Sequence, residues 1–446
     1  MLSPRNRELL GLVPSALLVI AGFTAIFVQQ QSNEAGGDTS VTLNHASSAS
    51  LTYGLLFLGL CVATHVVIRF ALPDADPYLF PLAAVLASIG IVMLYRIDPT
   101  YARQQAQWMI LGLILFSATI IMLRGPRLAV LERYRYTIAL GGIGLTLLPR
   151  VTGGAVNGAY LNINAAGISF QPAELGKVAI VIFLASYLRD NRQLLVTAGR
   201  KVLFFKLPPM KQFGPLLVVW GAAMLTLLIT KEIGTSIMFY GAFLVLLYVA
   251  TGRLSYPVIG LLLFALGAWY LGTHIGHIHE RVLAWEHPFN VSLYNAPQGS
   301  YQLAQGLFAQ ADGGVLGTGF GQSLLTYPGT HSVILPVPES DLIYAVITNE
   351  LGLAGAAALL GVYLMFVARG LKAASLARDS FSKLLACGLS VVVALQVFVI
   401  VGGVTRLIPL TGVTLPLVAY GGSSVVMNFV LLGLLLIVSD QARRPA

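Results

Sequence analysis

The sequence predicts an all-α polytopic membrane protein with about twelve transmembrane helices and a long outer loop. Three observations predict this class. Hydrophobic residues make up 57% of the 446 residues. Charged residues make up only 10%, against roughly 25% in soluble domains. Apolar runs long enough to cross a bilayer recur along the whole chain. This composition excludes a disordered chain and argues against a soluble cytosolic enzyme.

The predicted spans follow one another from the N-terminus to the C-terminus. A bilayer core of about 30 Å requires an apolar helix of about 17 to 25 residues, and the fifth and sixth runs are short. The runs are Leu9–Val28, Leu51–Leu72, Leu79–Tyr95, Gln107–Leu123, Tyr136–Leu148, Glu174–Leu188, Phe213–Thr230, Gly234–Thr251, Tyr256–Gly272, Leu342–Ala368, Leu384–Val404 and Val425–Ser439.

The basic residues predict the orientation of these spans. Cytoplasmic loops carry an excess of Lys and Arg, and most of the 27 basic residues lie on one side if both termini are cytoplasmic. The outer side holds only Arg96, Arg103, Arg150, Lys231, Arg281 and Arg406. The net charge of +9 therefore reflects topology, and no nucleic-acid partner is expected. The basic segment 189–212 is either a topology determinant or a contact for anionic membrane lipids.

Two charged segments interrupt the apolar runs. Glu174 and Lys177 in FQPAELGKVAIVIF lie at i and i+3, on one face of a predicted helix. Ionisable groups inside spans mark functional sites by default, so this pair either projects into a polar cavity or forms a structural ion pair. Lys231, Glu232 and Gly234 in LLITKEIGTSIMF indicate either a broken helix beside a cavity or a tight external hairpin.

The largest soluble segment, residues 273–340, is predicted to lie outside and to carry the chemistry, because structureless loops of that length are usually functional. It contains Arg281 and Glu286 in ERVLAWEHPFN, and Asp341 and Glu350 follow it in PESDLIYAVITNELGLAG. The glycines of GGVLGTGFG do not match a dinucleotide fingerprint and predict tight turns at the membrane surface.

Three further features are ambiguous by themselves. The histidines 274, 277, 279 and 287 do not have a strong metal-ligand spacing, so hydrogen-bonding roles are favoured. Cys61 and Cys387 lie in apolar runs and predict neither a disulfide scaffold nor a zinc ribbon. Arg406 in VTRLIPLTGVTLPLVAYGGSS either recognises phosphate oxygens or caps a helix end.

Together these segments resemble the SEDS family, the shape, elongation, division and sporulation proteins of the RodA and FtsW type. The resemblance covers residues 76–442 and rests on motifs in the order of the family. These are YRIDPTYARQQAQW, SFQPAELGKV, KEIGTS, GSYQ with GGVLGTGFG, PESDLIYAVITNELGLAG and PLTGVTLPLVAYGGSS. It implies a ten-helix core over residues 76–446. Residues 1–75 would then add a cytoplasmic tail and two helices.

The resemblance implies a peptidoglycan glycosyltransferase of the bacterial cytoplasmic membrane. Such a protein polymerises lipid II on the outer face, beside a class B penicillin-binding protein that cross-links the product. The reaction needs a carboxylate that accepts a hydroxyl proton and cations that stabilise the departing pyrophosphate. A divalent cation, Mg²⁺ or Mn²⁺, is a plausible addition, and no organic cofactor is expected.

Individual residues of this chain correspond to the roles that the resemblance implies. Lys177, Arg281 and Arg406 are candidates for pyrophosphate binding, with Glu174 orienting Lys177, and Asp341 is a further substrate-binding candidate. One departure matters most. The family has an Asp in the outer loop, where this chain has Val291 or Asn295, depending on the direction of counting. Glu286 is the only carboxylate between Arg281 and Asp312, and we nominate it as a displaced catalytic base.

Two other functions compete with an active polymerase. The missing Asp is compatible with a non-catalytic relative that scaffolds or regulates a penicillin-binding protein. The intramembrane Glu174 and Lys177, with the interruption at Lys231, are compatible with a flippase for lipid-linked precursors.

Overall fold

The computed structural model describes residues 3–33, 39–152, 162–165, 168–197, 200–202, 205–207, 210–296, 299–323, 325–326 and 333–444. Within them the chain is helical, with two short antiparallel strand pairs. The helices are α1 (Pro4–Gly11), α2 (Val13–Asn33), α3 (Thr39–Ala71), α4 (Leu79–Ile97), α5 (Pro99–Leu123), η1 (Gly125–Leu128), α6 (Ala129–Arg133), α7 (Arg135–Thr152), α8 (Pro172–Thr197), α9 (Met210–Thr230), α10 (Ile233–Thr251), α11 (Ser255–His274), α12 (Gly276–Glu286), α13 (Val291–Tyr294), α14 (Tyr301–Gly313), α15 (Ile343–Leu376), α16 (Ser380–Val404) and α17 (Gly422–Arg443). The strand pairs are β1 (Ile163–Ala165) with β2 (Ile168–Phe170), and β3 (Arg200–Val202) with β4 (Phe205–Leu207).

Each predicted span coincides with a helix. In the described part of the chain, nine helical segments are long and apolar enough to cross a membrane, and Gly214–Thr230 forms a shorter apolar one. The fifth and sixth predicted spans correspond to α7 and α8. The predicted all-α polytopic fold is therefore confirmed. The division into residues 1–75 and a core of residues 76–446 stays a prediction.

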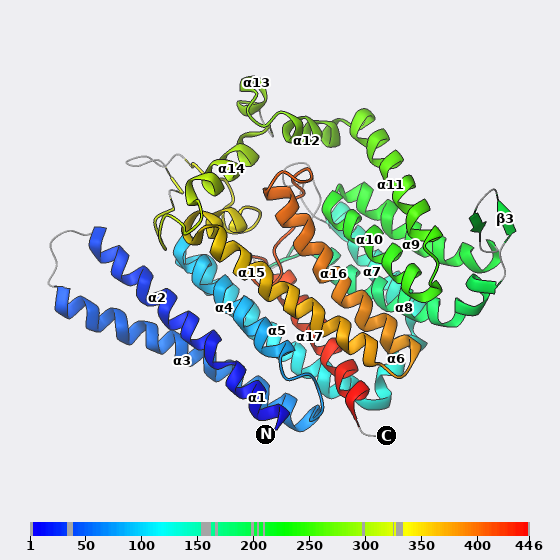
Figure 1. Cartoon of the computed structure of the whole chain (residues 1–446), viewed down its shortest axis with the longest axis horizontal. Coiled ribbons are helices and arrows are strands. Elements are labelled where there is room, and N and C mark those ends of the chain that lie inside the picture. The colour runs from blue at the N-terminus through cyan, green and yellow to red at the C-terminus, as the bar shows by residue number, and fades with distance from the viewer. Residues whose placement is uncertain are drawn as a thin grey trace.

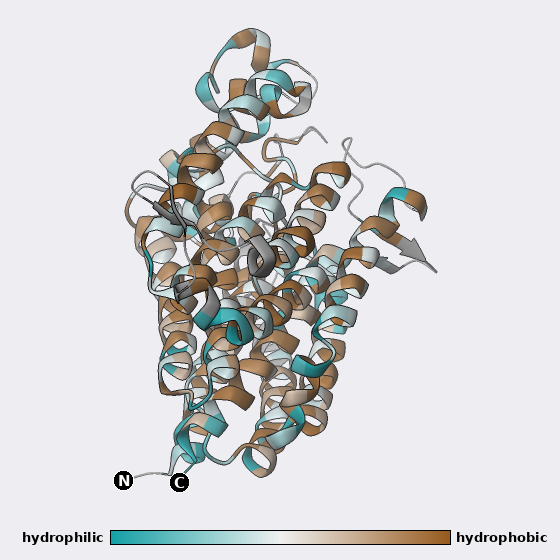
Figure 2. Ribbon diagram, turned by 90° about the vertical axis from the view of Figure 1, so that its right-hand side faces the viewer, coloured by the Kyte–Doolittle hydropathy of each residue, from teal (hydrophilic) through white to brown (hydrophobic). Residues whose placement is uncertain are grey.

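The helices form a bundle with both termini at one end (Figure 1). The hairpin of α2 and α3 packs along one side against α4 and α5. At the opposite end α12, α13 and α14 arch over the bundle (Figure 1). Hydrophobic residues predominate along the helices, and hydrophilic residues gather near the termini (Figure 2), as expected for helices whose sides face lipid and whose ends face water.

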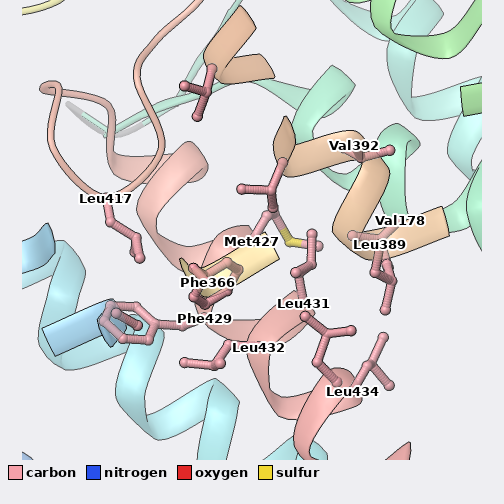
Figure 3. Close-up of a cluster of buried hydrophobic side chains, with 14 of the residues drawn as sticks. Val178, Phe366, Leu389, Val392, Leu417, Met427, Phe429, Leu431, Leu432 and Leu434 are labelled. Carbon is pink, nitrogen blue, oxygen red and sulfur yellow. The ribbon is translucent and has the colours of Figure 1, made fainter. Parts of the chain in front are cut away.

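The centre of the bundle is α17, which contacts α4, α5, α8, α15 and α16. Its Met427, Phe429 and Leu432 lie in a cluster with Phe366 of α15 and other buried apolar side chains (Figure 3). By contrast, α11 contacts mainly α10 and α12. Its Leu262 is 59% exposed, which is typical of a lipid-facing helix because lipid tails are as apolar as leucine.

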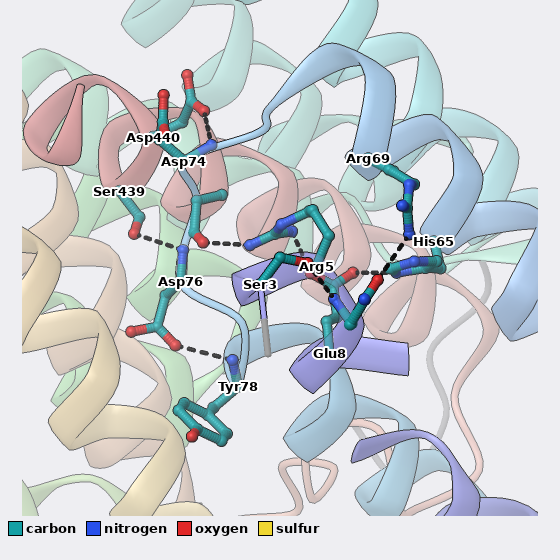
Figure 4. Close-up of polar contacts among 12 residues, drawn as sticks. Ser3, Arg5, Glu8, His65, Arg69, Asp74, Asp76, Tyr78, Ser439 and Asp440 are labelled. Carbon is teal, nitrogen blue, oxygen red and sulfur yellow. Dashed lines mark hydrogen bonds and ion pairs between the residues drawn. The ribbon is translucent and has the colours of Figure 1, made fainter. Parts of the chain in front are cut away.

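A network of buried polar groups joins the N-terminal helices to the core at the terminal end (Figure 4). Arg5 and Glu8 of α1 form an ion pair, and Glu8 Oε1 lies 2.9 Å from His65 Nδ1 of α3. The backbone N–H of Asp76 donates to Ser439 Oγ of α17 at 3.0 Å. Arg5 Nη2 also donates to the carbonyl of Ala75, next to Asp76. Buried polar groups require such partners, so these contacts connect α1 and α3 with the segment that contacts α17.

The outer segment 273–340 is not the structureless loop expected from its sequence, since it contains α12, α13 and α14. Its glycines do form the predicted turns. Gly317 has φ +88° and packs against the backbone of α15, where an added Cβ would lie 2.1 Å from the carbonyl oxygen of Glu350. Glycine is required there because only a residue without a side chain permits this approach. The turn is fixed further by Glu350, which accepts the N–H of Gly321 at 2.9 Å and pairs with Arg96 of α4 at 3.1 Å.

Candidate functional site

A cavity of about 670 Å³ opens at the end of the bundle opposite the termini. The first residues of α17, including Ser423 and Ser424, line it, while Arg443 at the last turn of α17 pairs with Asp76 near the N-terminal helices. The first half of α5, the start of α10, Arg281 of α12, residues of the β1–β2 region and the segments before α15 and α17 also line the cavity. Ligand sites commonly enclose about 300 to 1,000 Å³, so the cavity has the size of a substrate pocket.

Two carboxylates and two cations line the cavity: Glu232, Asp341, Lys231 and Arg281. Arg281 of α12 donates to the carbonyl oxygen of Leu410 at 3.2 Å. Burial lowers the pKa of Arg281, and the charge of Asp341 opposes this shift. Burial raises the pKa of Asp341, although Arg281 and the hydroxyl of Ser340, which donates to Asp341 Oδ1 at 3.0 Å, favour the charged form. The outer loop thus supplies a cation that interacts with a partly buried carboxylate.

Glu232 is the second cavity carboxylate and lies between α9 and α10. Its side chain is 7% exposed. Burial raises its pKa to about 7, with the negative charge of Glu174 adding to the shift and hydrogen bonds from Thr235 and Gln171 opposing it. In the described part of the chain, its Oε2 atom has no hydrogen-bond partner. A buried carboxyl with a free oxygen and a pKa near neutrality is suited to hold a proton or a ligand.

Lys231 shows which of the two predicted alternatives the KEIGT segment adopts. Its N–H donates to the carbonyl of Leu228 at 3.2 Å, and the N–H of Glu232 donates to Leu227 at 2.9 Å. These are the two hydrogen bonds of a Schellman motif, which places Lys231 at the position that glycine usually occupies. Its φ is +63°, a conformation that costs a non-glycine residue on the order of 1 kcal/mol. Trp220 of α9 stacks on Phe243 of α10 with ring centroids 4.8 Å apart, so the two helices form a tight hairpin beside the cavity.

Glu174 and Lys177 lie behind the cavity wall and do not line it. Lys177 Nζ is 2.5 Å from Glu174 Oε2, and both side chains are 4% exposed. The same Nζ donates to Gln396 Oε1 at 2.8 Å, and Gln396 Nε2 donates to the carbonyl of Thr414 at 2.8 Å. Thr414 lines the cavity, so the ion pair is connected to the wall through two hydrogen bonds. Both alternatives for the pair, a structural and a substrate-binding role, remain compatible with this position.

Arg406 and Glu286 lie outside the cavity, at the end of α12. Arg406 Nε donates to the carbonyl of Trp285 at 2.9 Å, and Nη2 donates to the carbonyl of Glu286 at 2.8 Å. Arg406 therefore ties the end of α12 to the segment that follows α16, whereas the Glu286 carboxylate is exposed. Val291 and Asn295, at the positions of the expected Asp, are also exposed. The catalytic role of Glu286 stays a prediction that this placement does not support.

The polar wall contributed by α5 and the start of α17 was not predicted from the sequence. Gln104 and Trp108 line the cavity, and the hydroxyl of Tyr420 donates to Gln104 Oε1. A Cβ on Gly422 would lie 2.2 Å from the Trp108 ring, so this glycine makes room for the indole. The motifs YARQQAQW and YGGSS were visible in the sequence, but nothing in either indicated that they meet.

The histidines have local partners. His274 Nδ1 lies 3.0 Å from the carbonyl of Tyr270, and His279 Nδ1 lies 2.8 Å from that of Gly272. The side chain of His277 lies outside the described residues. Among the residues that are described, no group of three or more His, Cys, Asp or Glu side chains is placed to hold a metal ion.

Comparison with known proteins identifies relatives of this chain. The peptidoglycan glycosyltransferase RodA of Mycobacterium tuberculosis is 39% identical over 99% of this chain and 92% of its own length. The probable peptidoglycan glycosyltransferase FtsW of Geobacter metallireducens is 30% identical over 82% of this chain and 95% of its own length.

Two solved structures are similar in fold. One is a peptidoglycan synthase complex that coordinates polymerization and crosslinking, with a TM-score of 0.65 and 23% identity, covering 83% of this chain and 99% of the other. The second is the rod shape determining protein RodA of Thermus thermophilus, with a TM-score of 0.58 and 22% identity, covering 83% of this chain and 98% of the other. The family model of the cell cycle proteins FtsW, RodA and SpoVE matches residues 77–444. The resemblance noted from the motifs is thereby confirmed, and the chain belongs to the FtsW/RodA/SpoVE family of cell cycle proteins.

Proposed function

We propose that this protein is a peptidoglycan glycosyltransferase that polymerises lipid II on the outer face of the bacterial cytoplasmic membrane. The observation that carries the proposal is the cavity at the end opposite the termini, where the partly buried Asp341 interacts electrostatically with Arg281 and where Lys231 and Glu232 add to the charged wall. The names of its relatives support the same activity. Charged groups converging on one cavity are the default mark of an active site.

The reaction requires a proton acceptor, an anion-stabilising wall and a defined orientation of two lipid-linked substrates. The 4-hydroxyl oxygen of one lipid II attacks the anomeric carbon of the other chain. A C–O bond forms there while the bond from that carbon to the pyrophosphate oxygen breaks. The hydroxyl proton passes to a carboxylate, and the polyprenyl pyrophosphate leaves with the bonding electron pair. The configuration at the anomeric carbon inverts from α to β.

Asp341 is the carboxylate that we assign as proton acceptor. It lines the cavity, and its raised pKa moves it toward the operating pH, where general bases are most effective. Arg281 favours the charged form of Asp341 and would thereby keep the carboxylate ionised until it accepts the hydroxyl proton. Glu286, the base nominated from the sequence, would have to turn from the exposed end of α12 into the cavity, so we keep it as the alternative to be tested.

The environment of the protein completes the proposal. The two termini would lie in the cytoplasm and the cavity outside, in agreement with the distribution of basic residues. The partner would be a class B penicillin-binding protein, because a similar structure is that of a complex that coordinates polymerization and crosslinking. Membrane lipids would surround the exposed apolar helix faces.

A divalent cation remains a proposal as well. Mg²⁺ is often bound by one or two carboxylates together with substrate phosphates. The cavity carboxylates Asp341 and Glu232, of which the latter has a free Oε2 atom, fit that ligand type within the described residues. When bound, the ion would neutralise negative charge on the departing pyrophosphate.

The test is polymerisation of fluorescent lipid II by the purified full chain, alone and with its cognate class B penicillin-binding protein. We expect glycan ladders from the wild type, none from Asp341→Asn, and ladders from Glu286→Gln. The exposed Asp312 of α14 provides the matched control Asp312→Asn, which should polymerise like the wild type. If Glu286→Gln lost polymerisation while Asp341→Asn retained it, Glu286 of α12 would be the catalytic base instead of Asp341.

The competing functions give different results. A wild type that forms no ladder even with its partner would favour a non-catalytic scaffold. Transbilayer movement of labelled lipid II in proteoliposomes, above that of protein-free vesicles, would favour a flippase.

A further inference from the structure

Lys231 is a cation of the cavity wall without a carboxylate partner. Arg281 interacts electrostatically with Asp341, and Glu232 accepts hydrogen bonds from Thr235 and Gln171. In the part of the chain that the structure describes, no ion pair includes Lys231, although the residue lines the cavity. A partly buried ammonium group without a counter-ion favours binding of an anion from outside the protein.

The backbone conformation at Lys231 does not explain why this position holds a lysine, so the reason lies in its side chain. The Schellman motif at the end of α9 would be satisfied better by glycine, because φ is +63°. Backbone strain of this kind is found most often at ligand-binding and catalytic positions. Lysine at the glycine position therefore points to a use for its ammonium group.

Two long helices begin at the same cavity, which adds hydrogen-bond donors to the charge of Lys231. Helix α10 starts at Ile233, immediately after Lys231 and Glu232, and α17 starts at Gly422. Neither helix has a side-chain cap, so the backbone N–H groups of both first turns are free of that competition. Such termini carry partial positive charge and bind phosphate groups.

The two carboxylates of the cavity wall have other partners. Asp341 interacts electrostatically with Arg281 and accepts a hydrogen bond from Ser340. Glu232 accepts hydrogen bonds from Thr235 and Gln171, and among the described residues its Oε2 atom has no hydrogen-bond partner. The wall at the start of α10 therefore presents the ammonium group of Lys231 and backbone N–H groups to an anion.

We propose that Lys231, together with the N-termini of α10 and α17, binds the pyrophosphate group of the lipid-linked sugar substrate. The assignment rests on the proposed function for the identity of the lipid. The chemistry itself requires only a pyrophosphate, which can be free or attached to a polyprenyl chain. From the sequence alone, Lys231 indicated only an interruption between two apolar runs. The cavity makes it a binding residue in addition to Arg281.

The experiment measures pyrophosphate binding directly, without the polymerisation reaction. The full chain is placed in phosphatidylcholine nanodiscs and titrated by calorimetry with inorganic pyrophosphate and with polyprenyl pyrophosphate. A third series repeats the pyrophosphate titrations in nanodiscs that contain phosphatidylglycerol. We expect saturable binding of both pyrophosphates by the wild type. Lys231→Met should weaken that binding about tenfold or more, and Lys231→Arg should stay within about threefold. The exposed Lys372 of α15 provides the charge control, since Lys372→Met should bind like the wild type.

Misfolding is controlled by Lys231→Gly. Glycine suits the backbone of this turn, so thermal unfolding should occur at the same or a higher temperature while pyrophosphate binding is lost. Unchanged pyrophosphate binding in Lys231→Met and Lys231→Gly would overturn the proposal, as would a wild type that binds neither pyrophosphate. If substitution of Lys231 changed the calorimetric signal only in phosphatidylglycerol nanodiscs, the proposal would be overturned in favour of a phospholipid headgroup as the ligand of Lys231. A wild type that binds pyrophosphate through Lys231 but polymerises no lipid II would refute the proposed function and leave this subsite in place.

Discussion

Removing the Lys177 ammonium group should strongly destabilise the protein, because Glu174 would keep a buried charge without a partner. The two groups are 2.5 Å apart and both side chains are 4% exposed. At an effective dielectric constant of about 20, unit charges at that distance attract by about 7 kcal/mol, and the desolvation of each ion offsets several kcal/mol. We therefore expect Lys177→Met to lower the free energy of unfolding by about 3 to 5 kcal/mol.

The assay is a double-mutant cycle, with equilibrium unfolding of each variant measured in the same detergent micelles. Glu174→Gln/Lys177→Met removes both charges and should recover most of the loss, since replacing a whole buried pair is often close to neutral. The coupling energy between the two sites should be about 3 kcal/mol or more. Additive losses, with no recovery in the double variant, would refute the view that the two charges stabilise each other.

The same variants separate the two roles that the sequence left open. If the pair only fixes helix packing, the double variant should regain polymerisation together with stability. If Lys177 contributes to substrate binding through Gln396 and Thr414, the double variant should regain stability but keep a raised KM. Binding of lipid II measured beside the unfolding curves distinguishes these outcomes.

Three further predictions concern stability in the same unfolding assay. Lys231→Gly should raise the free energy of unfolding by about 1 kcal/mol because glycine accepts the positive φ, and a decrease would refute the strain at this turn. Gly317→Ala should cost about 3 kcal/mol or more, since its Cβ would lie 2.1 Å from a carbonyl oxygen. The control Gly314→Ala, with φ +52° and no atom within 4 Å of its Cβ, should cost only about 1 kcal/mol, and equal losses would contradict the packing argument. Finally, the folded state should hold the Glu232 proton more tightly than the unfolded state. Its stabilising contribution is then fully present below a pH of about 4.5 and lost as pH rises through about 7, a loss of about 3 kcal/mol at most that Glu232→Gln should abolish.

The helical secondary structure of this protein was readable from local sequence. A helix in lipid must satisfy its own backbone hydrogen bonds, so an apolar run of sufficient length has few alternatives to a helix. Even the short runs that became α7 and α8 followed this rule. The helices in the segment 273–340 were not predicted from the sequence. The helices α12, α13 and α14 are short, and their stability comes from packing rather than from a long periodic pattern.

The candidate site was readable only in part. Charges inside or beside apolar runs were visible because they are expensive there. They identified Arg281 and Asp341, which line the cavity, and Glu174 with Lys177, which are connected to its wall. The sequence did not distinguish these from Glu286 and Arg406, which do not line the cavity, because all are charged and only the folded chain decides which of them reach it.

Composition, apolar periodicity and charge placement, which act over one helix at a time, determined the polytopic helical class of this protein, and ordered motifs determined its family. The tertiary structure decided which side chains share a cavity. The turn at Lys231, the start of α17 and the segment around Asp341 are separated by long stretches of chain, and helix packing alone brings them together. A sequence records the chemistry of each residue, whereas a binding site depends on distances between residues that no local pattern contains.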